Sequence, residues 1–263
     1  MARTALSDKV AGVLLAGGSG TRMRPLTRHR NKHLLPVHMR PMIDYALGTL
    51  LGMGLSDILV VTGRNHMGQV VDVLGSGTDY GDGVEFTYRV QDEARGIADA
   101  LALARPFAAG RRLCVMLADN VLDDDSPREV MRAFADAEPP HAVNFLAEVE
   151  DPSAYGVARL EGDRVIEIVE KPTDPPSKLA VTGLYLYPSD AFDFIDGLEP
   201  SQRGELEVSD LNNAYAQAGR LEHHVVTNWF DAGEPGPWAT TCRYVQDNPA
   251  RFGDARFQLY TGA

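Results

Sequence analysis

Residues 10–22, VAGVLLAGGSGTR, join a short apolar run to a glycine-rich turn. The apolar part, residues 10–16, has the length and the sharp ends of a buried β-strand. Because glycine has no Cβ, the turn lets backbone N–H groups come close to an anion. Cationic side chains follow the turn, at Arg22, Arg24, Arg28, Arg30 and Lys32. This order of strand, glycine turn and cations predicts a binding site for a polyphosphate.

The spacing of the glycines separates this turn from two other phosphate-binding loops. A dinucleotide fingerprint, G-x-G-x-x-G, needs a third glycine where Met23 stands, and a Walker loop needs a Gly-Lys-Ser/Thr triplet that the turn lacks. A tight turn with solvated arginines is the alternative for the glycines alone. The cluster of cations favours the binding site, and the failed fingerprint argues against a dinucleotide-dependent oxidoreductase.

The charge of the chain is strongly asymmetric. It carries 25 Lys and Arg against 37 Asp and Glu, a net charge of −12, yet the first forty residues hold eight basic side chains and one acid, Asp8. A positive segment on an acidic body suits a local anion site. No second basic stripe follows, so we expect no nucleic-acid partner.

Composition indicates a globular protein of the cytoplasm. An apolar content of 44% over 263 residues is enough for a sizeable core. The two cysteines, Cys114 and Cys242, fit a reducing compartment without a disulfide framework. We expect no membrane partner, because no run approaches the ~20 apolar residues of a spanning helix and no apolar signal opens the sequence.

Strand and helix patterns alternate through the first half of the chain. Beyond the first strand we expect strands at 57–61, 84–88 and 113–117, and helices at 41–51, 69–74 and 96–104. This alternation predicts an α/β fold with a mostly parallel, Rossmann-like sheet and helices on both faces. The second half is richer in strands, at 142–148, 157–160, 165–170, 181–187 and 223–227, before a tail helix at 237–246.

We interpret the chain as one domain, residues 1–263, that serves two substrates. About 1–120 form the nucleotide-binding half, about 121–236 the strand-rich half for a second substrate, and about 237–263 a C-terminal tail. Ligands of such sheets bind at the carboxyl ends of the strands.

Two aspartates stand at predicted strand ends. Asp119 follows the strand at 113–117, and Asp231 ends an aromatic run. Carboxylates there could hold Mg²⁺ against a triphosphate, although an isolated aspartate more often caps a turn. Residues 123–125, three aspartates in a row, precede SPRE (126–129), a capping box, so we expect them to be a solvated approach to a helix.

A further acid, Glu170, falls on the apolar face of its strand by the period-two alternation of side chains. An acid in that position needs partners such as sugar hydroxyls. Alternation turns Lys171 to the other face, where it could meet a phosphate. Arg203 could also bind phosphate, although by itself it has the pattern of a surface loop residue.

Nine motifs in a fixed order carry a family resemblance. They are LAGGSGTR (15–22), KHLLP (32–36), PMI (41–43), ADN (118–120), YGV (155–157), EKP (170–172), AVTGLY (180–185), RGELE (203–207) and DAG (231–233). In this order they are highly specific, and the chain resembles the bacterial sugar-1-phosphate nucleotidylyltransferases, most closely those that join dTTP to glucose 1-phosphate. The resemblance implies that a nucleoside triphosphate and a sugar 1-phosphate give an NDP-sugar and pyrophosphate.

The resemblance also implies roles for individual residues. The catalytic group would be Arg22, Lys32, Asp119 and Lys171, with Mg²⁺ held by Asp119 and Asp231. The nucleotide would be bound by Leu15, Ala16, Gly17, Gly18, Ser19, Gly20, Thr21, His33, Gln91 and Gly96. The sugar phosphate would be bound by Tyr155, Gly156, Glu170, Lys171, Val181 and Arg203.

The departures from the family pattern keep alternatives open. His33 stands where the thymidylyltransferases usually have a glutamine, and a histidine cannot copy the paired donor and acceptor of an amide. Transfer from UTP, CTP or GTP, or to another sugar phosphate, therefore stays open, as does a non-catalytic sugar-nucleotide sensor. The sensor is disfavoured because the charged site residues are all present. Family resemblance further implies a homo-oligomer.

Overall fold

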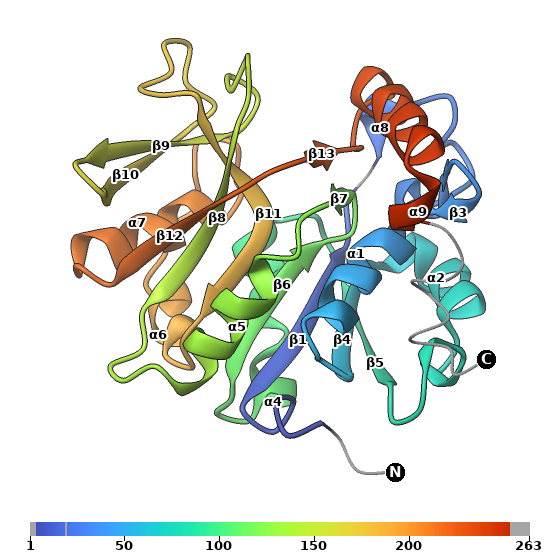
Figure 1. Cartoon of the computed structure of the whole chain (residues 1–263), viewed down its shortest axis with the longest axis horizontal. Coiled ribbons are helices and arrows are strands. Elements are labelled where there is room, and N and C mark those ends of the chain that lie inside the picture. The colour runs from blue at the N-terminus through green and yellow to red at the C-terminus, as the bar shows by residue number, and fades with distance from the viewer. Residues whose placement is uncertain (1–3, 19, 253–263) are drawn as a thin grey trace.

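A nine-stranded sheet runs through the computed structural model, which describes residues 4–18 and 20–252 (Figure 1). The strand order β10-β9-β11-β6-β1-β4-β5 is extended by β8, which pairs with β11, and by β12, which pairs with β8. The bounds of these strands are β1 Val10–Ala16, β4 Asp57–Gly63, β5 Glu85–Gln91, β6 Arg112–Leu117, β8 Ala142–Glu148, β9 Gly156–Glu161, β10 Arg164–Glu170, β11 Leu179–Tyr187 and β12 Leu221–Val226.

The first predicted strand lies in the middle of the parallel part of this sheet. All seven residues of β1 are buried, and β1 pairs in parallel with both β4 and β6. Since a parallel sheet is covered on both faces, its strands consist of continuous apolar residues. The α/β class with a parallel Rossmann-like core is confirmed. Beyond β6 the pairing changes, because β11 is antiparallel to β6, β8 and β9.

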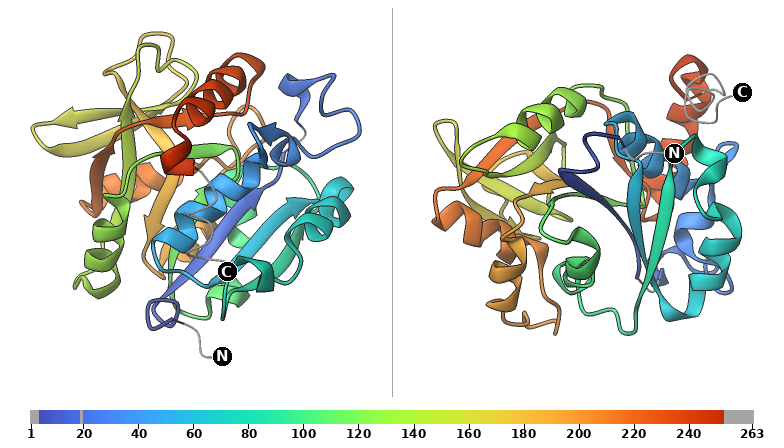
Figure 2. Two further views of the ribbon diagram at one scale, coloured as in Figure 1. Left: turned by 45° about the vertical axis from the view of Figure 1, so that its right-hand side comes forward. Right: turned by 90° about the horizontal axis from the view of Figure 1, so that it is seen from below.

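Helices cover both faces of the sheet (Figure 2). One apolar cluster packs α1, α2 and α5 against one face, and a second packs α3, α4, α6 and α7 against the other. Helix bounds are α1 Met42–Gly52, α2 Met67–Leu74, α3 Ile97–Ala102, α4 Arg105–Ala108, α5 Pro127–Asp136, α6 Ala191–Asp196, α7 Val208–Gln217, α8 Pro235–Asp247 and α9 Pro249–Phe252. Pro41 ends a short strand, so α1 begins one residue later than predicted. Within the described residues, no helix combines the length and apolar character needed to cross a membrane.

Two small sheets and four short 3-10 turns complete the architecture of the described residues. The strands β7 (Asn120–Leu122) and β13 (Trp229–Asp231) pair antiparallel, as do β2 (Pro36–Val37) and β3 (Arg40–Pro41). The chain from β12 through β13 to α8 passes over the end of the central sheet at which β7 lies (Figure 1). The turns are η1 Thr21–Met23, η2 Lys32–Leu34, η3 Arg64–His66 and η4 Thr78–Tyr80.

The predicted capping box at residues 126–129 is wrong. Ser126 has helical backbone angles and makes no side-chain cap; its hydroxyl instead pairs with His224 Nε2 at 2.8 Å. The carboxylate of Asp124 instead accepts the Ser126 N–H at 2.8 Å. Asp124 also accepts the Thr227 N–H at 2.7 Å and so ties the start of α5 to the end of β12.

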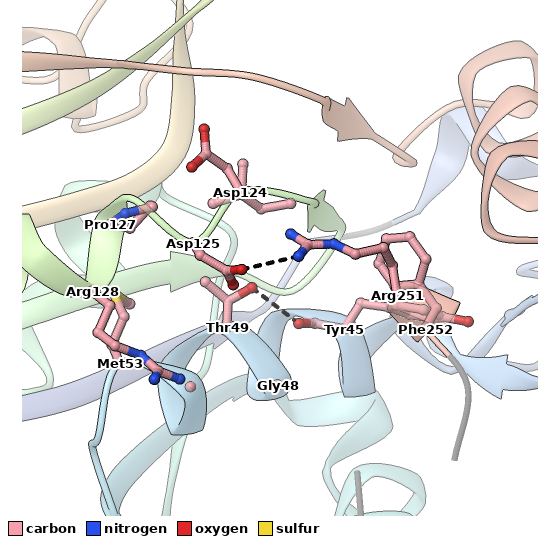
Figure 3. A pocket seen from close by; sticks show the side chains of 12 residues that line it. Tyr45, Gly48, Thr49, Met53, Asp124, Asp125, Pro127, Arg128, Arg251 and Phe252 are labelled. Carbon is pink, nitrogen blue, oxygen red and sulfur yellow. Dashed lines mark hydrogen bonds and ion pairs between the residues drawn. The ribbon is translucent and has the colours of Figure 1, made fainter. Parts of the chain in front are cut away.

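The neighbouring aspartates are docking points for the C-terminal helices, and of the two only Asp125 is exposed to solvent as predicted. Asp123 is buried and accepts hydrogen bonds from Tyr244 and Arg251. Arg251 also reaches Asp125 at 2.9 Å, in a pocket whose opposite wall is α1 (Figure 3). Phe252 packs edge-on against Tyr45 of α1. These contacts hold α9 against α1 and the turn before α5.

Candidate active site

A cleft of about 330 Å³ lies where β1, β5 and β6 end, and it extends to β10, β11 and the start of α7. This is the edge at which the parallel sheet predicted a ligand site. Sixteen of the predicted site residues line it: Leu15, Gly17, Gly18, Arg22, Lys32, His33, Gln91, Gly96, Asp119, Tyr155, Gly156, Glu170, Lys171, Val181, Arg203 and Asp231.

The remaining predicted residues belong to the glycine turn. Ser19 lies outside the described residues. Ala16, Gly20 and Thr21 are not among the lining residues; the Ala16 carbonyl accepts hydrogen bonds from Asn31 and Thr62, and the Gly20 carbonyl accepts one from Thr27. Their interactions shape the turn, and their role in nucleotide binding stays a prediction.

Asp119 and Asp231 converge although 111 residues separate them in sequence. The pairing of β13 with β7 places Asp231 opposite Asn120, and the Ala232 N–H donates to the Asp119 carbonyl at 2.8 Å. A Cβ placed on Gly233 would lie 2.9 Å from Asp231 Oδ1 and 3.0 Å from Asp119 Oδ2. Both carboxylates therefore face the same point, which only a glycine leaves open.

The two carboxylates differ in their pKa. Burial opposes ionisation of Asp119, but Lys32 Nζ, 2.5 Å away, outweighs burial and holds the pKa of Asp119 well below its usual range. Burial and the charge of Asp119 raise the pKa of Asp231 to about 6. A cation between them would relieve this repulsion, since hard divalent ions prefer carboxylate oxygens.

Arg22 and Glu234 form an ion pair at the edge of this acidic centre. Arg22 Nη1 lies 2.5 Å from Glu234 Oε1, and both side chains are about half exposed. Glu234 immediately precedes α8, so the pair connects the turn after β1 with the C-terminal helix. Arg22 is thereby held beside the carboxylates, and its charge partly offsets that of Asp231.

The opposite end of the cleft is built around the Glu170 carboxylate. Ser209 of α7 donates to Glu170 Oε2 at 2.5 Å, while Arg203 Nη2 and Lys171 Nζ lie 3.3 and 3.7 Å from Oε1. A Cβ on Gly156 would lie within 3.4 Å of Glu170 Oε2 and 3.2 Å of the Ser209 hydroxyl. Sugar hydroxyls can replace these donors at Glu170, and the two cations can then bind a phosphate.

The predicted orientation of Lys171 is wrong. Alternation along the strand would turn Lys171 away from Glu170, but β10 ends at Glu170 and the backbone of Lys171 is left-handed, with φ of +44°. This local turn returns the lysine to the side of the acid, and both residues line the cleft.

His33 is a neutral, buried side chain on the nucleotide-loop side of the cleft. Burial and the neighbouring Lys32 lower the pKa of His33 to about 3. Its Nδ1 lies 2.8 Å from Asn31 Oδ1, which also accepts the His33 N–H. Because Asn31 Oδ1 is an acceptor, Nδ1 carries the proton.

Gly96 joins the two halves of the cleft by a close backbone contact. Its φ is +104°, and a Cβ there would lie 2.3 Å from the Leu206 carbonyl oxygen. The Leu206 N–H donates to the Arg95 carbonyl at 2.8 Å, so the segment around Gly96 is bonded to the loop that carries Arg203.

We expect Gly96→Ala to lower the free energy of unfolding by about 3 kcal/mol or more, because an alanine in this extended conformation with positive φ costs ~1–3 kcal/mol and the backbone clash adds to it. Gly110 is the matched control, since its φ is +85° but nothing lies within 4 Å of its Cβ. Urea unfolding of both variants measures the difference. Equal losses would show that the Leu206 contact carries no weight.

Sequence reasoning assigned no role to four polar residues of this site. Asn120 donates to Asp119 Oδ1 at 3.0 Å and accepts the Gly183 N–H and the Trp229 indole N–H. Ser209 and Glu234 hold Glu170 and Arg22, and Asp99 accepts from Gln91. Only Asn120 could have been identified from the sequence, because it stands beside Asp119 at a strand end. The other three contact their partners only through tertiary structure.

A sheet-edge cleft with a glycine turn, an acid pair beside a lysine and an arginine, and a second cationic subsite defines an enzyme class that transfers a phosphorus-bound group between two anionic substrates. Comparison with known proteins agrees with this class. Residues 11–246 match the family model described as nucleotidyl transferase. The chain belongs to this family.

Curated relatives of this chain carry the name of one particular enzyme. The chain is 41% identical over 226 residues to a glucose-1-phosphate thymidylyltransferase of Xanthomonas campestris pv. campestris, covering 84% of this chain and 76% of the relative. It is 39% identical over 239 residues to the enzyme of the same name from Neisseria meningitidis, covering 89% and 82%.

Solved structures show the same fold. A structure from Bacillus anthracis that is named for glucose-1-phosphate thymidylyltransferase, in complex with a sucrose, is 44% identical, with a TM-score of 0.85 over 90% of this chain and 96% of that one. A UDP-glucose pyrophosphorylase in complex with UDP-glucose is 23% identical, with a TM-score of 0.79 over 91% and 99%, and shares the fold.

Proposed function

We propose that this chain transfers a nucleotidyl group from a nucleoside triphosphate, dTTP first, to a sugar 1-phosphate, glucose 1-phosphate first, giving an NDP-sugar and pyrophosphate. The supporting observation is the single cleft that has the carboxylate pair with Lys32 and Arg22 at one end and Glu170 with Lys171 and Arg203 at the other. Two anionic substrates that react with each other need two cationic subsites that lie next to each other in one cleft. The names of the relatives support the choice of dTTP and glucose 1-phosphate.

The nucleotide belongs at the glycine-turn end. Gly17 and Gly18 offer close backbone approach to phosphates, and Arg22 and Lys32 neutralise the triphosphate. His33, Gln91 and Gly96 line the wall beyond the turn, where the base would lie. In the free protein Lys32 forms an ion pair with Asp119. The triphosphate therefore binds to a lysine whose position is already fixed.

The sugar phosphate belongs at the opposite end. Lys171 and Arg203 hold its phosphate, and Glu170 accepts from sugar hydroxyls. Tyr155, Gly156 and Val181 form the walls beside them. Gly156 keeps this part of the cleft open, because any larger residue there would contact Glu170 and Ser209.

The reaction is an in-line displacement at phosphorus. A phosphate oxygen of the sugar 1-phosphate forms a bond to the α-phosphorus of the triphosphate, and the bond from that phosphorus to the bridging oxygen breaks, so pyrophosphate leaves with the electron pair. The attacking oxygen is already anionic, and no general base is required. Positioning and charge neutralisation by Arg22, Lys32 and Lys171 supply the catalysis.

Asp119 and Asp231 would hold Mg²⁺. Two carboxylates that face one point, one of them with a raised pKa, fit a divalent cation that also takes phosphate oxygens as ligands. Such an ion neutralises charge on the phosphates. The family is generally metal-dependent, and the choice of Mg²⁺ is part of this proposal.

An assay of pyrophosphate release tests the proposal. With Mg²⁺ and glucose 1-phosphate, we expect dTTP to release pyrophosphate with the highest kcat/KM of a panel that includes UTP, CTP and GTP, and mass spectrometry to find the NDP-sugar. Omission of the sugar phosphate is the control. Triphosphate binding without pyrophosphate release from any pair would favour a sugar-nucleotide sensor instead.

Three broader proposals accompany this function. We propose that residues 1–263 act as one domain, with the nucleotide and sugar halves of the cleft supplied by the parts of the chain assigned to them. The free cysteines Cys114 and Cys242 support a reducing, cytoplasmic location. Family resemblance supports a homo-oligomer, which light scattering in solution would measure.

A further inference from the structure

The amide of Gln91 has a fixed orientation. Gln91 ends β5 at the cleft, on the side of the glycine turn, and only 7% of the residue is exposed. Its Nε2 donates to the Gly96 carbonyl at 3.1 Å and to Asp99 Oδ2 at 2.8 Å. Carbonyl and carboxylate oxygens only accept, so the nitrogen of the amide must face them. Both Nε2 protons are used in this way.

The oxygen of the same amide is turned toward the glycine loop. A Cβ on Gly17 would lie 3.3 Å from Gln91 Oε1, which places this oxygen beside the start of the turn that borders the cleft. Gln91 therefore presents an acceptor, and no donor, to a ligand on that wall.

Asp99 is held in place from its far side. It lies in the first turn of α3, its side chain is 17% exposed, and Arg95 Nη2 contacts Oδ1 at 3.2 Å. One carboxylate oxygen thus binds the arginine and the other binds Gln91. A flipped amide would place Oε1 against this carboxylate, and two acceptors in contact repel.

We propose that Asp99 is a positioning residue that sets the base preference of the site through the Gln91 amide. The proposal rests on the proposed function. A base that carries a proton at N3, thymine or uracil, can donate to Oε1. Cytosine has an acceptor at N3 and would face another acceptor in a desolvated wall, which is unfavourable. The site therefore selects N3–H pyrimidines over cytosine.

The first test compares dTTP, dUTP and dCTP with the unaltered protein. Calorimetric binding without sugar phosphate measures base selection apart from turnover. We expect dTTP and dUTP to bind at least ~10²-fold more tightly than dCTP, because the cytosine would leave buried acceptors opposed. Equal binding of dTTP and dCTP would overturn the inference even where pyrophosphate release supports the function. Selective binding without any turnover would reject the function and keep the inference.

The second test is Asp99→Asn. An asparagine can accept from Gln91 Nε2 or donate to Oε1, so the Gly96 carbonyl alone would then oppose a flip of the amide. We expect the ratio of dTTP to dCTP affinity to fall about tenfold, the value of one hydrogen bond. Asp92→Asn removes the same charge from an exposed acid that pairs with Arg64 at 2.8 Å, and it should leave the ratio unchanged. An unchanged ratio in Asp99→Asn, or equal losses for both nucleotides, would show that Asp99 only supports the fold.

Discussion

Asp231→Asn is expected to lower kcat by ~10³-fold and, at neutral pH, to make the protein more stable. The loss of activity follows because one of two carboxylates that would hold the metal becomes a neutral amide, and a bound metal contributes several kcal/mol to charge stabilisation at phosphorus. The gain in stability follows because the free protein keeps two acids face to face. A variant that merely misfolds would lose activity and stability together.

The pH dependence of this gain has a definite sign. The folded state raises the pKa of Asp231 to about 6, so between the unfolded pKa of ~3.9 and 6 the folded state binds more protons and stability falls as pH rises. A shift of about two pKa units corresponds to about 3 kcal/mol. Asp231→Asn should therefore exceed the unaltered protein by up to about 3 kcal/mol above pH 6 and match it near pH 4.

Unfolding in urea from pH 4 to pH 8, without divalent ions, measures this difference. Asp196→Asn is the control, because Asp196 is exposed, pairs with Arg105 and lies outside the cleft. Mg²⁺ should raise the Tm of the unaltered protein at pH 8 and not that of Asp231→Asn, since binding to the native state alone stabilises it. If Asp231→Asn is less stable than the unaltered protein at pH 8, the two acids do not repel as inferred.

The sequence was sufficient for the parts of the fold that depend on local pattern. The apolar run before Gly17 is β1, and the alternation after it gives the parallel strands. Motif order was sufficient to name the residues at both ends of the cleft. In each case a short segment carries its own information, because hydrophobic period and glycine spacing are local properties.

The convergence of Asp119 with Asp231 could not be derived from local pattern. It depends on the pairing of β13 with β7 and on a glycine at 233 that leaves space for both acids. The orientation of Lys171 was predicted wrongly because the alternation rule assumes an extended backbone, and φ at this residue is positive. The capping box failed because Asp124, a residue outside the motif, competes for the same N–H group.

Arg22→Ala is expected to lower kcat by ~10²-fold or more while leaving Tm within experimental error. Its guanidinium lines the cleft beside the carboxylate pair, and loss of a preorganised charge at a reacting phosphate costs about this much. Stability should not change, because the Arg22 side chain is 63% exposed and its ion pair with Glu234 is one of the weak surface type.

Arg28→Ala is the matched control for this prediction. Arg28 is an exposed cation of the same basic segment and does not line the cleft, so its removal subtracts the same charge without touching the substrate. Steady-state kinetics with saturating dTTP and glucose 1-phosphate separate the two, since a general field effect would lower both variants alike. Glu234→Gln gives the complementary result: it keeps Arg22 and removes the acid that competes with the triphosphate for it, so KM for dTTP should fall. An unchanged kcat in Arg22→Ala would show that Arg22 only pairs with Glu234 and takes no part in catalysis.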